Sequence, residues 1–514
     1  MAYFMGIDVG TGGVRAVVLD ETGDILGIGE KEYALITPKP NWVEQNPEDW
    51  WDACCFAAKK AAKSSGKGLD IAGIGLSGQQ QGSTLLDKSN KVLGNCMIWL
   101  DQRASSVADE LNTVLPASEI MDINGNFCMP SHWAAKLLWI KRNMPEVFEK
   151  INCVLCPKDY LRFMMTGELA TDVTDCVATF MFDIKKRCWS DKMIKAVDLP
   201  REILPDRIWE SADVAGHLKA DIAKEWGMKP GIPVVAGGGD QSAGAVGSGV
   251  VRNGVVAVSI GTSGVVYGCC DEPIMFTERS SISNLCHSVR GMYSYLGCTL
   301  AAGGSYKWLR DTFFAHQRDD MAARGQDVYE YMNSLAEKIP EGSEGTCFLP
   351  YLNGEITPHI DPDARGVFFG LSYRHGLGAI CRSVMEGVAF SQRDSLEIVR
   401  EHLQAKVTEV RALGGGAKSA LWRQIQADIY NASVLTVNLK DGPAAGAAIL
   451  AGVGSGHYKS EVEACDSIVK TVSVTDPIPK NVEIYNEYYE TYKGLYFDLK
   501  ERFKSQAQIV EKTT

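Results

Sequence analysis

The sequence predicts an α/β protein built from two similar, duplicated domains that flank a cleft. Its 514 residues are too many for one compact core of ordinary size. Its N-terminal part reads as strands joined by glycine turns and followed by helix and strand in alternation, the pattern of layered α/β domains. A second unit of this kind begins near the middle of the chain. We therefore expect one domain over residues 1–248 and another over 249–514.

The first domain begins with β-rich runs separated by glycine turns. Turns are expected at 10–13 and 21–24, and a helix over 42–63, with Pro47 in its first turn. Strands are expected over 4–9, 14–19, 25–30 and 71–76.

The second domain repeats this opening. A strand over 255–260 leads into a glycine turn and a further strand. Gly10, Thr11, Gly13 and Val14 recur at one constant spacing as Gly261, Thr262, Gly264 and Val265. An internal duplication explains the match and its midpoint position. Two unrelated β-turns are the alternative.

Composition narrows the class of protein. A net charge of −12 offers no basic face for a nucleic acid. No apolar window is long enough to span a membrane, and the first residues read as a strand rather than a signal peptide. The 15 cysteines are scattered, which is typical of reduced thiols. We expect a cytoplasmic protein without nucleic-acid or membrane partners.

Asp8 stands at the end of the first strand, just before the glycine turn. Glycine lets backbone N–H groups approach an anion, and an acid beside phosphates needs a cation, for which Mg²⁺ is the natural choice. The second copy of the turn has Ser259 at this position, so one acid would serve both loops. The alternative is a plain hairpin that Asp8 caps.

Asp240 follows the glycines at 237–239, between an apolar strand over 232–236 and a helix. A carboxylate at this junction could accept a proton from an attacking hydroxyl, as phosphoryl transfer requires. An N-cap aspartate is the alternative, and the two roles are compatible.

Glycines also mark two other strand ends. Residues 413–419 could let a nucleotide lie against the backbone, although Ala417 replaces the glycine that a P-loop needs, and a tight turn is the alternative. Residues 73–78 match a dinucleotide fingerprint, with Asp101 where the ribose-binding acid belongs, which would indicate a nicotinamide-dependent dehydrogenase. The following residues 79–87 read as a turn and strand where that fingerprint requires a helix.

Two polar clusters suit a sugar. Residues 79–81 are three glutamines at a strand end, and 99–103 combine Trp99 with Asp101, Gln102 and Arg103. Amides and carboxylates bind hydroxyls, and an indole face covers C–H surface. Surface polarity and a core tryptophan are the alternative.

Together these motifs resemble the FGGY family of carbohydrate kinases, most closely the xylulokinase group. The similarity covers nearly the whole chain. It includes residues 6–14, 41–50, 75–82, 99–103, 157–161, 166–172, 238–240, 259–264, 308–311 and 413–422.

The resemblance implies two domains like those of actin and hexokinase (the ribonuclease H-like fold) and ATP-dependent, Mg²⁺-assisted phosphorylation of a small ketose, such as the pentulose xylulose. It makes Asp240 the catalytic base and Asp8 the Mg²⁺-side acid. On the nucleotide side it places Thr11, Gly261, Thr262, Gly303, Lys307, Gly415, Gly416 and Ala417. On the sugar side it places Gln80, Gln81, Trp99, Arg103 and Gln241.

Gln80 and Gln81 stand where xylulokinases usually carry Met-His, so another ketose or a polyol is an alternative substrate. A non-catalytic sugar or ATP sensor is a further alternative, which the presence of both Asp8 and Asp240 disfavours. The expected partners are the sugar and ATP, and a homodimer is possible.

Overall fold

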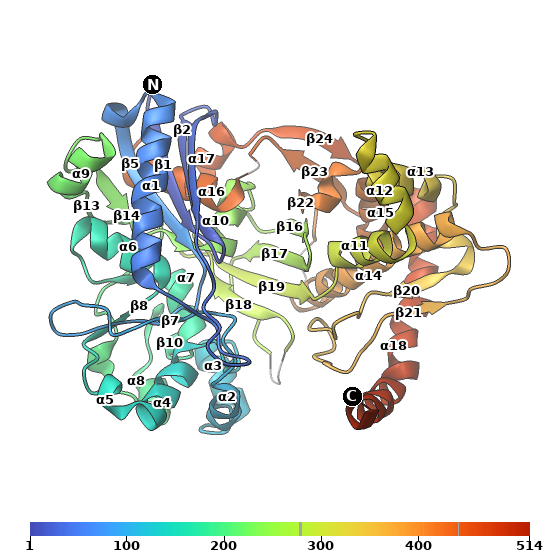
Figure 1. The fold of residues 1–514 in the computed structure, drawn as a ribbon, viewed down its shortest axis with the longest axis horizontal. Coiled ribbons are helices and arrows are strands. Elements are labelled where there is room, and N and C mark those ends of the chain that lie inside the picture. The colour runs from blue at the N-terminus through green and yellow to red at the C-terminus, as the bar shows by residue number, and fades with distance from the viewer. Residues whose placement is uncertain (277–279, 404–405, 440, 514) are drawn as a thin grey trace.

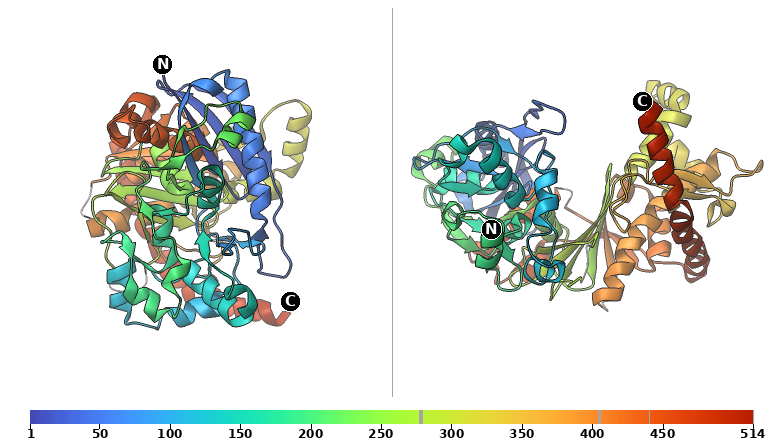
Figure 2. Two further views of the ribbon diagram at one scale, coloured as in Figure 1. Left: turned by 90° about the vertical axis from the view of Figure 1, so that its left-hand side faces the viewer. Right: turned by 90° about the horizontal axis from the view of Figure 1, so that it is seen from below.

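Two seven-stranded sheets form the framework of the computed structural model, which describes residues 1–276, 280–403, 406–439 and 441–513. Each sheet lies in its own lobe (Figures 1 and 2). The main path of the first sheet runs in the order β13 (Val214–His217), β14 (Pro233–Val235), β5 (Ile71–Gly78), β1 (Tyr3–Val9), β2 (Gly13–Asp20) and β3 (Ile25–Glu32). The short strand β15 (Gly238–Gly239) pairs with β5 beyond the end of β14.

The second sheet repeats the order of these six strands and adds a seventh, β18 (Ser283–Cys286), at one edge. It runs β24 (Thr471–Thr475), β23 (Ser433–Val437), β22 (Glu409–Gly414), β16 (Val255–Ile260), β17 (Gly264–Cys270), β19 (Tyr293–Thr299) and β18. Every corresponding pair of neighbours has the same direction: β1 and β5 are parallel, as are β16 and β22, and both glycine hairpins are antiparallel. The predicted duplication is therefore confirmed in the topology of the sheets.

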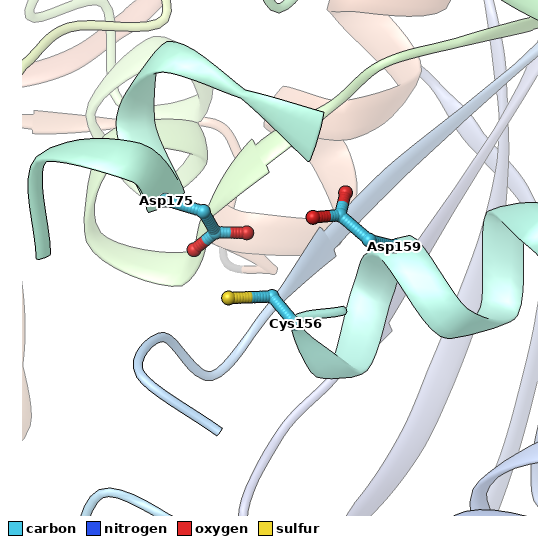
Figure 3. Close-up of side chains that lie close together, drawn as sticks. All are labelled: Cys156, Asp159 and Asp175. Atoms are coloured by element: carbon cyan, nitrogen blue, oxygen red, sulfur yellow. The ribbon is translucent and has the colours of Figure 1, made fainter. Parts of the chain in front are cut away.

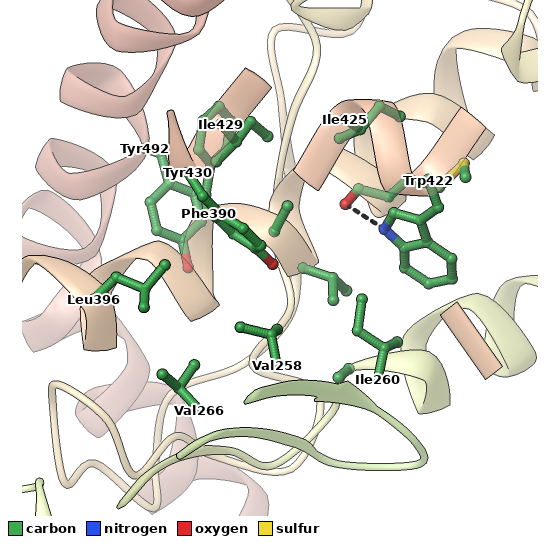
Figure 4. Packing of buried hydrophobic residues seen from close by; sticks show 14 of the residues in the cluster. Val258, Ile260, Val266, Phe390, Leu396, Trp422, Ile425, Ile429, Tyr430 and Tyr492 are labelled. Carbon is green, nitrogen blue, oxygen red and sulfur yellow. Dashed lines mark hydrogen bonds between the residues drawn. The ribbon is translucent and has the colours of Figure 1, made fainter. Parts of the chain in front are cut away.

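Helices cover both sheets. In the first lobe, α1 (Pro47–Ser65) packs on β2 and β3, while α10 (Asp240–Gly247) and α16 (Gly442–Gly454) pack against each other, and α16 lies along β1 and β5. In the second lobe, α14 (Leu377–Leu403), α15 (Ala420–Tyr430) and α18 (Pro479–Thr513) enclose a core rich in aromatic residues. Figure 4 shows Phe390, Trp422, Tyr430 and Tyr492 around Val258 of β16.

Each lobe carries a large insertion in a different crossover. Between β5 and β14 the first lobe holds α2 (Ser105–Leu111), α3 (Ala117–Asn124), α4 (Trp133–Asn143), α5 (Pro145–Phe148), α6 (Pro157–Thr166), α7 (Val173–Cys176), α8 (Asp191–Ala196) and α9 (Ala220–Trp226). Between β19 and β22 the second lobe holds α11 (Gly303–Phe313), α12 (Ala315–Ala323), α13 (Val328–Ala336) and α14.

The close approach of α16 explains the glycines of β5. A Cβ added to Gly75 would lie 1.9 Å from the carbonyl oxygen of Ala447, and one added to Gly73 would lie 2.8 Å from that of Ala451. Residues 84–86 form the strand β6 (Thr84–Leu86) rather than a helix. The match to a dinucleotide fingerprint thus reflects strand–helix packing, and the dehydrogenase interpretation loses its basis.

The expected strands and the mid-chain hairpin are confirmed, but the start of the first helix is not. The predicted helix over 42–63 begins at Pro47, because Asn46 caps it by accepting a hydrogen bond from the Glu48 N–H at 3.1 Å. Residues 44–45 instead form β4 (Glu44–Gln45), which pairs with β7 (Cys96–Met97). Within the described ranges, none of the helices combines the length and apolarity that a bilayer crossing requires.

Candidate active site

Asp8 lies near the end of β1, half-buried, opposite Ser77 of β5 and Arg15 of β2. No group in the described part of the chain donates a hydrogen bond to its Oδ1 atom, which is buried. Burial raises the pKa of Asp8 to about 6. An ionised carboxylate with an unpartnered buried oxygen is stabilised by a cation, so the donor chemistry here fits a bound Mg²⁺.

The two glycine turns are similar but not identical. In the first, Val9 pairs with Val14, and the Gly10 N–H donates to the Gly13 carbonyl at 3.0 Å. In the second, Ile260 pairs with Gly264, and the Gly261 N–H donates to the Ser263 carbonyl at 3.0 Å, so this turn is one residue shorter. Gly261 and Thr262 are exposed.

Asp240 is the first residue of α10, and the N-cap position belongs to Gly239. The alternative that Asp240 is itself the N-cap residue is therefore wrong. The Asp240 Oδ1 atom accepts a hydrogen bond from the Gln241 N–H at 2.7 Å. Removal from bulk water, and secondarily the charge of Asp8, raise the pKa of Asp240 to about 7. The fold thus brings the two predicted acids into one electrostatic environment.

A cleft of about 990 Å³ begins at Asp240 and extends between the two halves of the chain. Gln241 and Ser259 line it, as do Gly415, Ala417 and Lys418 from the junction between β22 and α15. Asp240 and Gln241 belong to α10, and the other residues to the strand ends of the second sheet, so Asp240 opens onto a space that the second domain also lines.

The predicted nucleotide-side residues gather around the end of β16. A Cβ on Gly303 would lie 2.4 Å from the Gly261 carbonyl, and the Thr262 carbonyl accepts hydrogen bonds from the first residues at α11. Gly416 is packed against the side chain of Ile260. Lys307 is exposed one turn into α11. The three glycine segments of the second half therefore form one surface.

Thr11 belongs to the glycine turn of the first lobe, where it contacts Trp99, a predicted sugar-side residue. Its hydroxyl accepts a hydrogen bond from the Trp99 indole N–H at 2.9 Å, and its carbonyl accepts one from Gln45 at 2.7 Å. Gln45 in turn accepts a hydrogen bond from Gln79 at 2.7 Å. Trp99 remains 44% exposed, which leaves an indole surface available to a ligand. Sequence reasoning missed the buried Gln45, which holds the glycine turn to the glutamine cluster.

The side chain of Gln80 packs against Gly239, the residue before the predicted base Asp240. Its side-chain N–H donates to the Thr174 carbonyl at 2.7 Å, and a Cβ on Gly239 would lie 2.5 Å from its amide carbon. Gln81 is half-buried and has a left-handed backbone with φ of 67°, and its carbonyl accepts a hydrogen bond from Lys136 at 2.9 Å. The structure therefore brings Gln80 to Asp240, whereas it fixes Gln81 through its backbone.

Arg103 occupies a different position from the one expected. Its side chain is 2% exposed and forms ion pairs with Asp101 and Glu44, each at 2.6 Å, while its guanidinium stacks 3.7 Å from the ring centre of Trp42. The sugar-side role of Arg103 stays a prediction, and its side chain is already engaged by two carboxylates. Its geometry favours a role in fixing the segment that presents Trp99, and sequence spacing gave no sign of the partner Glu44.

Comparison with known proteins agrees with this geometry. Residues 3–247 match the N-terminal domain of the FGGY family of carbohydrate kinases, and residues 256–455 match its C-terminal domain. A xylulose kinase of Escherichia coli is 37% identical over 499 residues, covering 96% of this chain and 99% of that protein.

Solved structures of other carbohydrate kinases have the same fold. A xyloylose kinase from Brucella ovis superimposes with a TM-score of 0.87 at 32% identity, over 97% of this chain and 99% of that one. A gluconate kinase from Lactobacillus acidophilus gives a TM-score of 0.86 at 26% identity, over 97% and 98% of the two chains. These relatives confirm the predicted two-domain α/β fold.

Proposed function

The chain belongs to the FGGY family of carbohydrate kinases, and from this premise we propose that it transfers the γ-phosphoryl group of ATP to a hydroxyl of a small ketose, with xylulose as the first candidate. One observation carries the proposal most directly. Asp240, a carboxylate with a pKa raised to about 7, opens onto the cleft beside Asp8 and faces the glycine segments of the second domain.

Asp240 acts as the general base in this proposal. A sugar hydroxyl is a weak nucleophile while protonated, and a carboxylate within hydrogen-bond reach orients it and takes its proton as the bond to phosphorus forms. A pKa of about 7 suits this task, because the group is a stronger base than an ordinary aspartate and is still ionised in part at neutral pH.

Asp8 would hold the Mg²⁺ that accompanies ATP, directly or through water. The ion supplies neutralisation of the phosphate charge when it is bound with the nucleotide. The residues fit this assignment, since the buried Asp8 Oδ1 atom has no hydrogen-bond donor in the described part of the chain. The same pair of acids disfavours a non-catalytic sensor.

We assign the sugar to the first domain, residues 1–248, and the nucleotide to the second, residues 249–514. The support is the separation of the two sets of residues, with the glutamines and Trp99 on the first lobe and the glycine segments on the second. Thr11 belongs to the first lobe and touches Trp99, so it would stand where the phosphate and the sugar meet. Cytoplasmic location and a homodimer stay predictions.

The exact sugar depends on Gln80 and Gln81. The Gln80 side chain packs against Gly239 and donates to the Thr174 carbonyl, so we expect its amide oxygen to contact a hydroxyl of the acceptor. The alternative, another ketose or a polyol, rests on these two amides. The gluconate kinase with the same fold supports it, because that framework also serves an acceptor of a different class.

A panel of pentuloses, hexuloses, polyols and sugar acids tests the function. We expect slow ADP release from ATP alone, and faster release with one acceptor, because closure on the sugar assembles the site and excludes water. NADH should remain unconsumed with every compound. ADP release that no acceptor raises would contradict the kinase proposal, and preference for an acceptor other than xylulose would contradict only the sugar assignment.

A further inference from the structure

A buried cluster of charges lies behind the sugar side of the cleft. Lys158 Nζ forms ion pairs with Asp159 at 2.7 Å, with Asp175 at 3.0 Å, and with Asp172, and all four side chains are fully buried. Arg162 pairs with Asp159 at 2.8 Å and is also fully buried. Buried charges of this density are costly unless they are paired, so the cluster calls for a structural or functional reason.

Metal binding does not supply that reason. Figure 3 shows Cys156, Asp159 and Asp175 pointing toward one another, as ligands would. The ammonium group of Lys158 already contacts both carboxylates, so a cation occupies the place where a metal would lie. Burial also raises the pKa of Asp175 to about 8, which makes this carboxyl a weaker metal ligand at neutral pH.

The cluster reaches the loop that carries Asp240 at two points. Arg162 donates a hydrogen bond to the carbonyl of Ala236 at 2.9 Å, just before the glycines at 237–239. Asp172 accepts hydrogen bonds from the N–H group of Thr174, at 2.8 Å, and from its hydroxyl. The cluster therefore holds one end of the loop directly and reaches the other through Thr174.

Thr174 completes this connection. Its hydroxyl, which donates to Asp172, accepts the N–H of Gly239 at 2.8 Å, and Gly239 immediately precedes Asp240. Its carbonyl accepts the side-chain N–H of Gln80 at 2.7 Å. One residue of the short helix α7 is thus bonded both to the backbone that aims the base and to an amide on the sugar side.

We propose that Thr174, oriented by Asp172 and Lys158, is a positioning residue that sets the direction of the Asp240 carboxylate; this rests on the proposed role of Asp240. The hydroxyl matters because it is donor and acceptor at once. Asp172, which contacts Lys158, accepts a hydrogen bond from the Thr174 hydroxyl, and this directs a lone pair of the hydroxyl oxygen toward the Gly239 N–H. Without the hydroxyl, a buried N–H and a buried carboxylate oxygen both lose a partner.

The test compares Thr174→Ser with Thr174→Ala. Both remove the same methyl group, and only serine keeps the hydroxyl. Thr179→Val is the matched control, because it deletes another buried threonine hydroxyl nearby, one that bonds to the Cys176 carbonyl at 2.7 Å rather than to the loop of the base. Each variant is assayed for kcat and for the KM of ATP and of the accepted sugar, with kcat normalised to the nucleotide-binding fraction.

We expect Thr174→Ala to lower kcat about 10- to 100-fold, in line with the cost of displacing a reacting group. The KM of ATP should stay unchanged, and Thr174→Ser and Thr179→Val should stay close to wild type. Equal kcat for the serine and alanine variants would overturn the proposal, as would a matching loss in Thr179→Val. If alanine does not fold, Thr174→Val replaces it, since its shape matches threonine. A different result would count against the role of Asp240 itself: full activity of Asp240→Asn while every variant at positions 174 and 179 is inactive.

Discussion

The two halves of this molecule share a sheet and differ in what is inserted into it. In the first half, residues 79–232 separate β5 from β14, whereas in the second half only a short turn and α15 separate the corresponding strands β22 and β23. The second half instead enlarges the crossover between β19 and β22. The first insertion supplies Gln80, Trp99 and Thr174, and the second supplies Lys307. The common sheet therefore positions the strand ends, while each insertion adds a different set of side chains to them.

The two halves also differ in where their acids with raised pKa values lie. Asp8 and Asp240 of the first half have raised pKa values, and Asp240 lines the cleft, as does Ser259, the residue that corresponds to Asp8. In the second half, Asp394 of α14 also has a raised pKa, but it is buried in the lobe, where Tyr489 donates a hydrogen bond to it at 2.6 Å. Titration of Asp8 and Asp240 should appear in catalysis, and titration of Asp394 in stability.

The largest effect is expected for Asp240→Asn. Asparagine preserves the shape and still offers an oxygen to the Gln241 N–H, but it cannot accept the proton of the sugar hydroxyl. We expect kcat to fall at least ~100-fold, with nucleotide binding and thermal stability near wild type. Steady-state kinetics with the accepted sugar, together with calorimetry of ATP binding, measure this. A variant with near-native kcat would remove the mechanistic difference between the halves.

Asp8→Ala and Ser259→Ala test the corresponding strand positions. The loss of Asp8 should raise the Mg²⁺ concentration needed for half-maximal turnover, roughly 10-fold or more, because a carboxylate ligand of the ion or of its water is gone. Ser259→Ala should leave the Mg²⁺ dependence unchanged. The KM of the sugar should change little in either variant. An unchanged Mg²⁺ dependence in Asp8→Ala would show that the two copies of the turn are equivalent toward the metal.

Gln81→His is expected to have a smaller effect, on the ranking of sugars. A histidine offers a hydrogen-bond geometry different from that of an amide, and one polar contact to a hydroxyl can decide between acceptors. We expect relative kcat/KM to move toward xylulose. Gln81→Asn serves as the control, since it keeps the amide at a shorter reach. An unaltered ranking would mean that Gln81 contributes only the carbonyl that binds Lys136.

The sequence predicts the elements that depend on local chemistry. The glycine hairpins and their β-rich flanks could be placed because the turn residues and strand propensities coincide there. Arg103 could not be placed, because its burial depends on Glu44 and Trp42, which are far away in the chain. Thr174 carried no signal at all, since a threonine in a short polar segment gains its meaning only from Gly239 and Asp172 in the folded state.

Asp394→Asn should have the smallest effect and tests the second half alone. The pKa of Asp394 is raised by burial from about 3.8 to about 7. Between these values the folded protein keeps a proton that the unfolded chain has released, so this group makes the protein less stable as the pH rises from about 4 to about 7, and has no further effect above 7. Asparagine can still accept the Tyr489 hydroxyl and does not titrate.

The apparent Tm of Asp394→Asn, measured relative to wild type, should therefore increase from pH 5 to pH 7 and then level off. The dependence of kcat on pH should be the same in both proteins, because Asp394 is not among the described residues that line the cleft. Parallel Tm curves would show that Asp394 is ionised in the fold. A shifted kcat profile would show that the buried acid of the second half communicates with the cleft, and the separation between the halves would then fail.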